Sequence, residues 1–389
     1  MNALEWRATL ALGAIYALRM LGVFMILPVF GLYAGGLPSH PSAELIAFAL
    51  TASGLTQAIF QIPLGRLSDR IGRRPVIALG MTVFACGSLV AGLSDNLLLI
   101  AAGRALQGAG AISSAVTALL ADVTREQVRT TAMAVMGAGM GFAFVLALIL
   151  GPLVDGLIGV PGIFRLTALL SLLSLPLIWW AAPQPEKVAR TSRAGGFGGA
   201  FSDRELLRLN GGILVLHALV PCVFLAVPVL IEQQFGWPAP QHWKIYLPVL
   251  LVTLIAALPL MRRADQGAVR PVLLGAVTTL AAGLLVAGFW SGPVGLIAGL
   301  SLFFFAFNLL EGLLPSRVSR RASPEHKGAA LGVYATAQFI GQPIGGALGG
   351  WTLLHYGPAA VLAVAAGLPI LWLTFAYGMQ SNAPAPIEP

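Results

Sequence analysis

Long hydrophobic runs dominate the chain, and short polar or glycine- and proline-rich breaks separate them. A helix needs about 20 apolar residues to cross the hydrocarbon core of a bilayer, and a barrel strand needs only about 10. Because lipid offers no hydrogen-bond partners to the backbone, runs of this length should be helices. The pattern predicts twelve transmembrane helices, at residues 8–33, 42–64, 75–93, 97–121, 130–154, 163–182, 206–232, 242–261, 271–290, 294–316, 327–355 and 359–377.

Composition supports a membrane protein and excludes a soluble one. Of the 389 residues 57% are hydrophobic and only 10% are charged, against roughly 25% charged in soluble domains. The net charge of +8 comes from basic residues in the breaks rather than from one basic stripe, so we expect lipid headgroups as partners and no nucleic acid. Cys86 and Cys222 lie inside apolar runs, so we expect them to be buried, with neither a disulfide framework nor a metal site.

The distribution of Lys and Arg predicts the orientation in the membrane. Nineteen of the 23 basic residues fall in alternate breaks, starting with the N-terminus, and Lys244 is alone on the opposite side. Since cytoplasmic loops carry the excess of basic residues, both termini should be cytoplasmic in a multi-pass protein of a bacterial inner membrane. The remaining three, Arg19, Arg104 and Arg165, lie inside apolar runs.

The longest break divides the helices into two sets of six. Residues 183–205 are rich in Pro, Gly, Ser and charge, as in a flexible cytoplasmic linker. Val23-Phe24 recurs 200 residues later as Val223-Phe224, and the stretch beginning at Asp69 recurs 196 residues later. Such repetition favours a duplicated unit. We therefore expect two pseudo-symmetric six-helix bundles, residues 1–182 and 206–389.

The break after the second predicted helix, residues 65–75, holds the most specific motif. Its glycines permit a tight turn, and its carboxylate can accept backbone N–H bonds or pair with an Arg. Arginine content alone would fit an ordinary cytoplasmic loop equally well. The string resembles the signature loop of the major facilitator superfamily, with matches at Gly65, Leu67, Asp69, Arg70, Gly72, Arg73 and Arg74.

Other segments extend this resemblance over nearly the whole chain. Residues 104–110 resemble the family's R-x-x-Q-G-x-G segment, and Asp122 stands where the family often has an acid that bonds the signature loop. The first helix at residues 18–28 and the tenth at residues 307–311 resemble the YajR-type branch of the drug:proton antiporters, and we expect the C-terminal soluble domain often found in that branch to be absent. Gly151 and Pro152 match an antiporter motif in the fifth helix, although Ala147 and Asp155 replace two of its glycines.

Ionisable residues inside apolar helices mark the candidate site, because charges are costly at this depth and face protein or water. Arg19 lies about 18 Å along the helix from Arg7, near mid-depth. Glu311, which shares a helix face with Asn308, is the leading candidate for carrying a proton, and His217 is the other. Further polar side chains either line a cavity or bond neighbouring helices: Arg104, Gln57, Gln61, Tyr334, Gln338 and Gln342.

The resemblance implies a secondary transporter that exports amphiphilic small molecules in exchange for protons by alternating access. In that mechanism Asp69, Arg70 and Asp122 latch the cytoplasmic side. The same scaffold could instead take up a sugar or an organic acid with protons, and Arg19 and Arg104 would suit an anion. A third alternative is a membrane sensor without transport. There is no P-loop, so we expect no internal ATPase and no enzyme. The resemblance implies that the proton gradient supplies the energy, and we expect a monomer without a cofactor.

Overall fold

The chain folds into α-helices in a computed structural model that describes residues 1–180, 203–322 and 327–378. These residues contain fifteen helical segments and no β-strand. The chain divides into two compact units, Met1–Thr191 with Pro238–Trp243, and Ser192–Trp237 with Lys244–Pro389. The division falls within the predicted linker, most of which lies outside the described residues.

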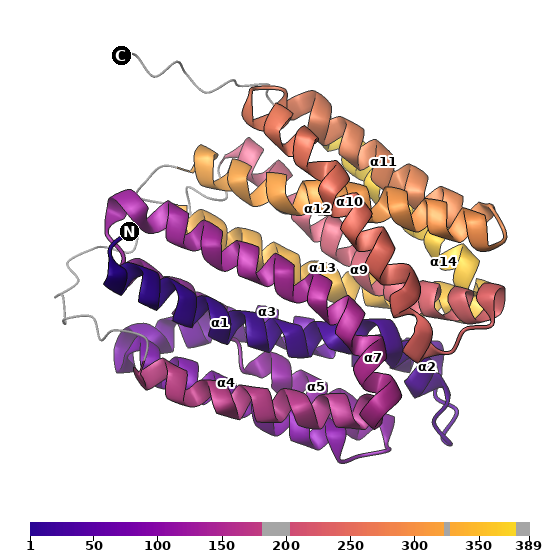
Figure 1. The fold of residues 1–389 in the computed structure, drawn as a ribbon, viewed down its shortest axis with the longest axis horizontal. Helices are drawn as coiled ribbons and strands as arrows, with labels where there is room; N and C mark the ends of the chain where they lie inside the picture. Colours follow the sequence, from indigo (N-terminus) through magenta and orange to yellow (C-terminus); the bar gives the residue numbers. More distant parts are fainter. Residues whose placement is uncertain (181–202, 323–326, 379–389) are drawn as a thin grey trace. The chain divides into compact units, whose positions relative to one another are not determined.

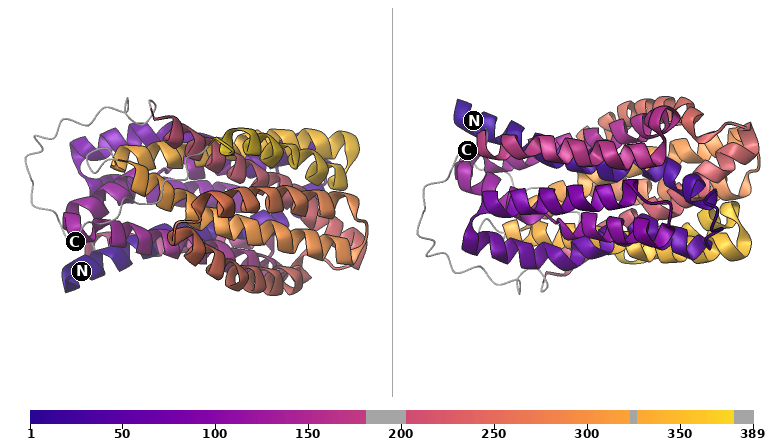
Figure 2. Two further views of the ribbon diagram at one scale, coloured as in Figure 1. Left: turned by 90° about the horizontal axis from the view of Figure 1, so that it is seen from above. Right: turned by 90° about the horizontal axis from the view of Figure 1, so that it is seen from below.

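The first unit is a bundle of helices that lie side by side along most of their lengths (Figures 1 and 2). In it α1 packs along α7, and α4 packs between α5 and α7, while α3 covers α5. Its helices are α1 (Ala3–Met25), α2 (Leu27–Gly35), α3 (Ala43–Ile71), α4 (Arg73–Gly92), α5 (Leu97–Ala109), α6 (Ser113–Val123) and α7 (Glu126–Trp180), with the 3₁₀ turn η1 (Ala239–Gln241).

Local sequence signals set the boundaries of these helices. Asn2 and Glu5 form a reciprocal capping box at the start of α1, and the Asn96 side chain caps α5. Within the long α7, Gly159 has φ +69°, a backbone conformation that residues with a Cβ rarely adopt. The α7 segment is therefore two helices that meet at Gly159, as the predicted fifth and sixth spans require.

The second unit is a bundle of the same kind (Figures 1 and 2). Its α9 packs along α13, and α11 packs along α12. The helices are α9 (Arg204–Phe235), α10 (Trp243–Asp265), α11 (Val269–Phe289), α12 (Pro293–Arg321), α13 (Lys327–Tyr356), α14 (Pro358–Ala365) and α15 (Gly367–Ala376).

Small residues allow α9 and α13 to approach closely. A Cβ on Gly345 would collide with the backbone of Ala218, and one on Gly341 would collide with the carbonyl of Leu214. A similar small-residue pair in the first unit behaves differently, because a Cβ on Gly137 or Gly141 would meet no atom within 4 Å. Sequence spacing alone does not distinguish a packed glycine stripe from an open one.

Ten stretches of the described residues are long and apolar enough to cross a membrane. One of them, Val135–Trp179, spans Gly159 and so contains two predicted helices, and α13 is not among the ten. Each predicted range overlaps helical structure in the described residues, with 181–182 of the sixth range lying outside them, whereas the number twelve stays a prediction. The expectation for Cys86 is wrong: its side chain is exposed on α4, and only Cys222 is buried.

Candidate functional site

A buried polar network surrounds Arg19 in the first unit. The Arg19 side chain is 1% exposed, and its Nη2 donates to Oε1 of Gln57 at 2.9 Å. Nε2 of Gln57 donates to the Ser113 hydroxyl at 3.3 Å, which bonds the Tyr16 hydroxyl at 2.7 Å. The guanidinium also lies over the ring of Phe84, 5.1 Å from its centroid. The network thus joins α1, α3, α4 and α6.

Arg104 anchors a second buried network beside the first. It is 1% exposed, and it donates to Oε1 of Gln107 at 2.7 Å and to the carbonyl of Leu50 at 3.0 Å. Gln107 in turn donates to the Ser88 hydroxyl at 2.7 Å. Arg104 therefore ties α5 to α3 and α4.

The two guanidinium groups are not neutralised by carboxylates. Neither makes an ion pair within the described part of the chain, and the two are close enough to repel each other electrostatically. Nε and Nη1 of Arg19 and Nε of Arg104 are buried N–H groups that find no acceptor among the residues the structure describes. Because uncompensated buried charge is costly, these donors are suited to an anion or to a carboxylate brought in from elsewhere.

Gln57 and Gln61 share a face of α3 as predicted, but their side chains do different things. Gln57 bridges Arg19 and Ser113, whereas Oε1 of Gln61 has no hydrogen-bond partner among the residues that the structure describes. The backbone carbonyl of Gln61 accepts from the Ser114 hydroxyl at 3.1 Å.

The second unit brings together three of its predicted site residues. His217 on α9 and Glu311 on α12 face each other, with 3.4 Å between His217 Nε2 and Glu311 Oε1. Nε2 of Gln338, on α13, lies 2.7 Å from the same imidazole nitrogen. An amide nitrogen only donates, so His217 Nε2 accepts from Gln338 and faces a second acceptor, the carboxyl oxygen of Glu311. Nε2 has one lone pair, which Gln338 already uses, so a proton between the two groups would be carried by the carboxyl oxygen of Glu311.

Aromatic rings border this cluster. Phe307 lies 6.3 Å from His217 and stacks on Phe303, with 5.8 Å between centroids. Tyr334 is buried and close enough to Glu311 to interact with it electrostatically. The Tyr334 hydroxyl has no hydrogen-bond partner in the described residues. The Glu311 side chain is 33% exposed as a whole, whereas its Oε1, which faces His217, is buried.

Asn308 and Gln342 lie outside the cluster. Asn308 donates to the Thr253 hydroxyl at 3.4 Å and so links α12 to α10. Gln342 is half-buried and hydrogen-bonds none of the cluster's residues.

The signature loop is organised by Arg73, which is 9% exposed on its side chain. It pairs with Asp69 at 2.5 Å and with Asp122 at 3.3 Å, and its Nη1 donates to the Ser68 hydroxyl at 2.6 Å. We define Ser68, Asp69, Arg73 and Asp122 as the signature cluster. It joins the end of α3 to the end of α6.

The latch expected from Asp69, Arg70 and Asp122 therefore needs one correction. Arg70 is exposed and makes no ion pair among the described residues, so Arg73 rather than Arg70 links the two aspartates. Asp69 lies on α3, which ends at Ile71, and Arg73 is the first residue of α4, so the turn between the two helices brings Arg73 to Asp69. Gly72 has φ +102° and makes the turn between the two helices.

Gly65, Arg74, Gly151 and Pro152 occupy packed positions. A Cβ on Gly65 would lie 3.1 Å from the Ser114 hydroxyl, so α3 and α6 are close there. Arg74 is half-buried at the start of α4. Gly151 and Pro152 are buried in α7, and a Cβ on Gly151 would collide with the Met25 carbonyl. The fifth-helix motif thus packs against the end of α1.

Sequence reasoning missed Tyr16, Ser88 and Ser113, because nothing local marks a hydroxyl that bonds a helix far away in the chain, and it placed Gln107 in the R-x-x-Q-G-x-G segment without its partners. It also missed Glu5, although Asn2-x-x-Glu5 is a capping-box pattern. No group of three or more His, Cys, Asp or Glu side chains that could hold a metal occurs in residues 1–180, 203–322 and 327–378.

Comparison with known proteins identifies the family. The sequence model of the Major Facilitator Superfamily matches residues 12–345 and, in a second match, 220–388. The chain is 42% identical over 386 residues to the inner membrane transport protein YajR of Escherichia coli K12. This alignment covers 97% of this chain and 84% of that protein. It is 24% identical over 383 residues to multidrug resistance protein 2 of Bacillus subtilis 168, covering 90% of this chain and 92% of that protein.

A solved structure gives the same assignment for the fold. The human organic anion transporter MFSD10 superposes with a TM-score of 0.72 and 20% identity, covering 97% of this chain and all of that one. The resemblance read from the signature loop and the all-α major facilitator fold are confirmed. On this family match, relative and fold, the chain belongs to the Major Facilitator Superfamily and is a membrane transporter of that family.

Proposed function

We propose that this transporter exports amphiphilic small molecules from the cytoplasm of a bacterium in exchange for protons, by alternating access. Its membrane would be the inner membrane, as the name of the Escherichia coli relative supports, with both termini in the cytoplasm. The name of the Bacillus subtilis relative, a multidrug resistance protein, supports export. Neither a cofactor nor an oligomer is required by this mechanism.

The observation that carries the proton coupling is the His217–Glu311 pair. Two acceptors 3.4 Å apart, one of them already accepting from Gln338, repel unless a proton lies between them. With that proton on the Glu311 carboxyl the pair is neutral, and without it a carboxylate remains uncompensated in an apolar helix. Uncompensated charge at membrane depth costs at least roughly 2.5–3.5 kcal/mol. The cluster therefore favours either a proton or a cationic group of a substrate.

Export then follows from competition at Glu311. An amphiphilic substrate would place its apolar part against Phe303 and Phe307 and its polar part at the carboxyl, where it displaces the proton. Reloading a proton from the outer side would release the substrate there. The signature cluster would hold the cytoplasmic side closed in one part of this cycle.

A flux measurement tests this assignment. The protein is reconstituted into liposomes, a pH gradient is imposed, and uptake of a fluorescent amphiphile is followed. Glu311→Gln keeps the shape of the side chain and removes the titration, so we expect gradient-driven transport to fall at least tenfold. Glu232→Gln is the matched control, because Glu232 is an exposed glutamate near the C-terminal end of the neighbouring helix α9. If Glu311→Gln transports as well as the wild type, the coupling residue is wrongly assigned.

One observation favours a second function, proton-coupled uptake of an organic acid. The unpaired donors of Arg19 and Arg104 suit an anionic substrate better than a cationic one. Bacteria that overproduce or lack the transporter separate the two: export predicts altered resistance to a panel of toxic amphiphiles, whereas uptake predicts altered growth on organic acids and unchanged resistance.

A further inference from the structure

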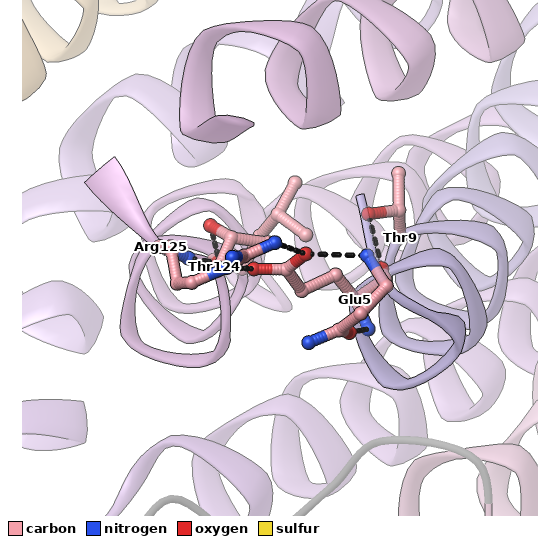
Figure 3. Close-up of polar contacts among 6 residues, drawn as sticks. Glu5, Thr9, Thr124 and Arg125 are labelled. Atoms are coloured by element: carbon pink, nitrogen blue, oxygen red, sulfur yellow. Dashed lines mark hydrogen bonds and ion pairs between the residues drawn. The ribbon is translucent and has the colours of Figure 1, made fainter. Parts of the chain in front are cut away.

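An ion pair outside the signature cluster joins the beginning of α1 to Arg125, which lies in the short link between α6 and α7 (Figure 3). Glu5 is 2% exposed, and its Oε1 accepts from Nε and from the backbone N–H of Arg125, at 2.8 and 3.1 Å. Oε2 accepts from Nη2 of Arg125 at 3.1 Å and from the backbone N–H of Asn2 at 2.7 Å. The carboxylate thus accepts four hydrogen bonds, two of them from the planar fork of one guanidinium, which is the stronger geometry for such a pair.

The second unit contains the equivalent pair. Asp203 caps the N-terminus of α9, accepting from the backbone N–H groups of Glu205 and Leu206, and its Oδ2 accepts from Nε of Arg321 at 2.7 Å. Arg321 is the last residue of α12. Arg125 and Arg321 are 196 residues apart, the same offset that relates the repeated stretches at Asp69 and Asp265. We define Glu5–Arg125 and Asp203–Arg321 as the end pairs.

Each end pair ties together the two helices of its unit that bear the buried ionisable residues. Arg19 follows Glu5 by 14 residues on α1, and His217 follows Asp203 by 14 residues on α9, about 21 Å along the helix in both cases. The partner helices carry the other members, since Glu311 lies on α12 and Arg104 on α5, which α6 continues. An end pair therefore fixes the depth of one charged residue relative to the other.

In the first unit, the broken fourth helix shows why an ion pair at the helix end is needed. The fourth predicted span is broken, because α5 ends at Ala109 and α6 begins at Ser113. Gly110, between them, has ψ +41° and interrupts the helical hydrogen bonds. A half-helix of 11 residues has few bonds of its own to hold its position, so its far end depends on Arg125 and on the signature cluster.

From this repeated arrangement we infer that the two end pairs are positioning pairs for transport, which hold the first and fourth helices of each unit in fixed register while that unit changes conformation. The inference rests on the proposed transport function but concerns residues that touch neither substrate nor proton. Loss of a pair is expected to loosen the helix end and slow the conformational step, leaving the substrate site intact.

The first test needs no substrate. In a Cys86→Ala, Cys222→Ser background, Thr124→Cys places a thiol at a position that is 4% exposed beside the first end pair (Figure 3). Its rate of reaction with a membrane-impermeant maleimide reports opening of this helix end. Glu5→Gln retains the hydrogen bond that caps α1 and removes the charge, and we expect labelling at least tenfold faster. Glu44→Gln, in the first turn of α3 and without an ion pair among the described residues, is the matched control and should label as the parent does.

A double variant shows whether the two residues act together. If the two residues act as one ion pair, the double variant Glu5→Gln/Arg125→Gln is labelled no faster than Glu5→Gln alone. The labelling rate of Arg125→Lys should lie between those of the parent and of Arg125→Gln. Labelling of Glu5→Gln within twofold of the parent overturns the inference. So does a double variant whose acceleration is the product of the two single effects, because the residues would then act independently.

Flux measurements extend the test to the second unit. Asp203→Asn retains a good helix cap, since Asn caps as well as Asp, and removes the ion pair with Arg321. We expect Glu5→Gln and Asp203→Asn each to lower the maximal transport rate about fivefold with KM within twofold of the wild type. A raised KM at an unchanged maximal rate would place these residues at the substrate site and overturn the inference. A wild-type protein without proton-driven flux would refute the proposed function and leave the labelling result to decide on the end pairs.

Discussion

The close packing of α9 on α13 leads to a quantitative prediction about Gly345. An added methyl group at this position would collide with the backbone of Ala218, which cannot rotate away as a side chain can. The two helices must then separate by on the order of 1 Å, since the packed interior leaves no other space. Separation would also stretch the 3.2 Å contact from Cys222 Sγ to the Gly345 carbonyl and the 2.7 Å contact between His217 and Gln338.

The expected cost follows from these contacts. Overpacking of a filled interior costs typically about 1–3 kcal/mol, whereas Gly→Ala in an open helix position gains up to about 1 kcal/mol from helix propensity. Gly332 on the same helix supplies that baseline, because a Cβ there would meet nothing within 4 Å. We expect Gly345→Ala to be less stable than Gly332→Ala by about 2 kcal/mol or more, which corresponds to roughly 4–8 °C in Tm for a unit of this size.

Thermal unfolding of the purified protein in detergent measures this difference. The His217–Gln338 contact gives a second readout, because Gly345→Ala should also impair proton-driven flux while Gly332→Ala should not. If the two variants unfold within about 1 °C of each other, the close approach of α9 and α13 does not constrain the protein and the packing argument is refuted.

Two further predictions concern charged residues at the helix ends. Burial alone would raise the pKa of Asp203, but the hydrogen bonds from Arg321 and from two backbone N–H groups outweigh it and lower that pKa. The ionised carboxylate therefore contributes stability above its unfolded pKa of about 3.9, and this is lost as the pH falls below that value through the folded pKa. We expect the Tm of Asp203→Asn to decline less steeply between pH 5 and pH 3 than that of the wild type, and equal slopes would contradict this. Arg73→Gln should lower the free energy of unfolding by about 1–3 kcal/mol because it removes a buried guanidinium shared by three acceptors, while Arg70→Gln, at an exposed position, should change it by less than about 0.5 kcal/mol; denaturant titration in detergent compares the two, and equal effects would return the latch to Arg70.

Part of the candidate site could be predicted from the sequence because burial of charge in lipid is rare. Arg19, Arg104, His217 and Glu311 are conspicuous within apolar runs, and all four make buried or half-buried polar contacts in the structure. Their partners could not be predicted. The imidazole of His217 meets Gln338, 121 residues away, and hydropathy contains no information about such pairing.

The sequence by itself was enough to infer that the chain lies in a lipid bilayer, that it is helical and that its motifs repeat. A sequence with 10% charge and twelve apolar runs must place its backbone hydrogen bonds inside helices in lipid, and the repeated motifs at offsets of 196 and 200 residues favour a duplicated unit. Local geometry also follows from local sequence, as with the capping box of Asn2 and Glu5.

Tertiary structure alone decided which charges meet. Arg73 rather than Arg70 joins the two aspartates, because the turn at Gly72 sets which side chain points at α6. Similarly, Arg125 in a loop reaches the buried Glu5 only because α1 begins and α6 ends at the same side of their bundle. Contacts between residues far apart in the chain depend on helix packing and register, which a one-dimensional pattern of hydrophobic and polar positions does not encode.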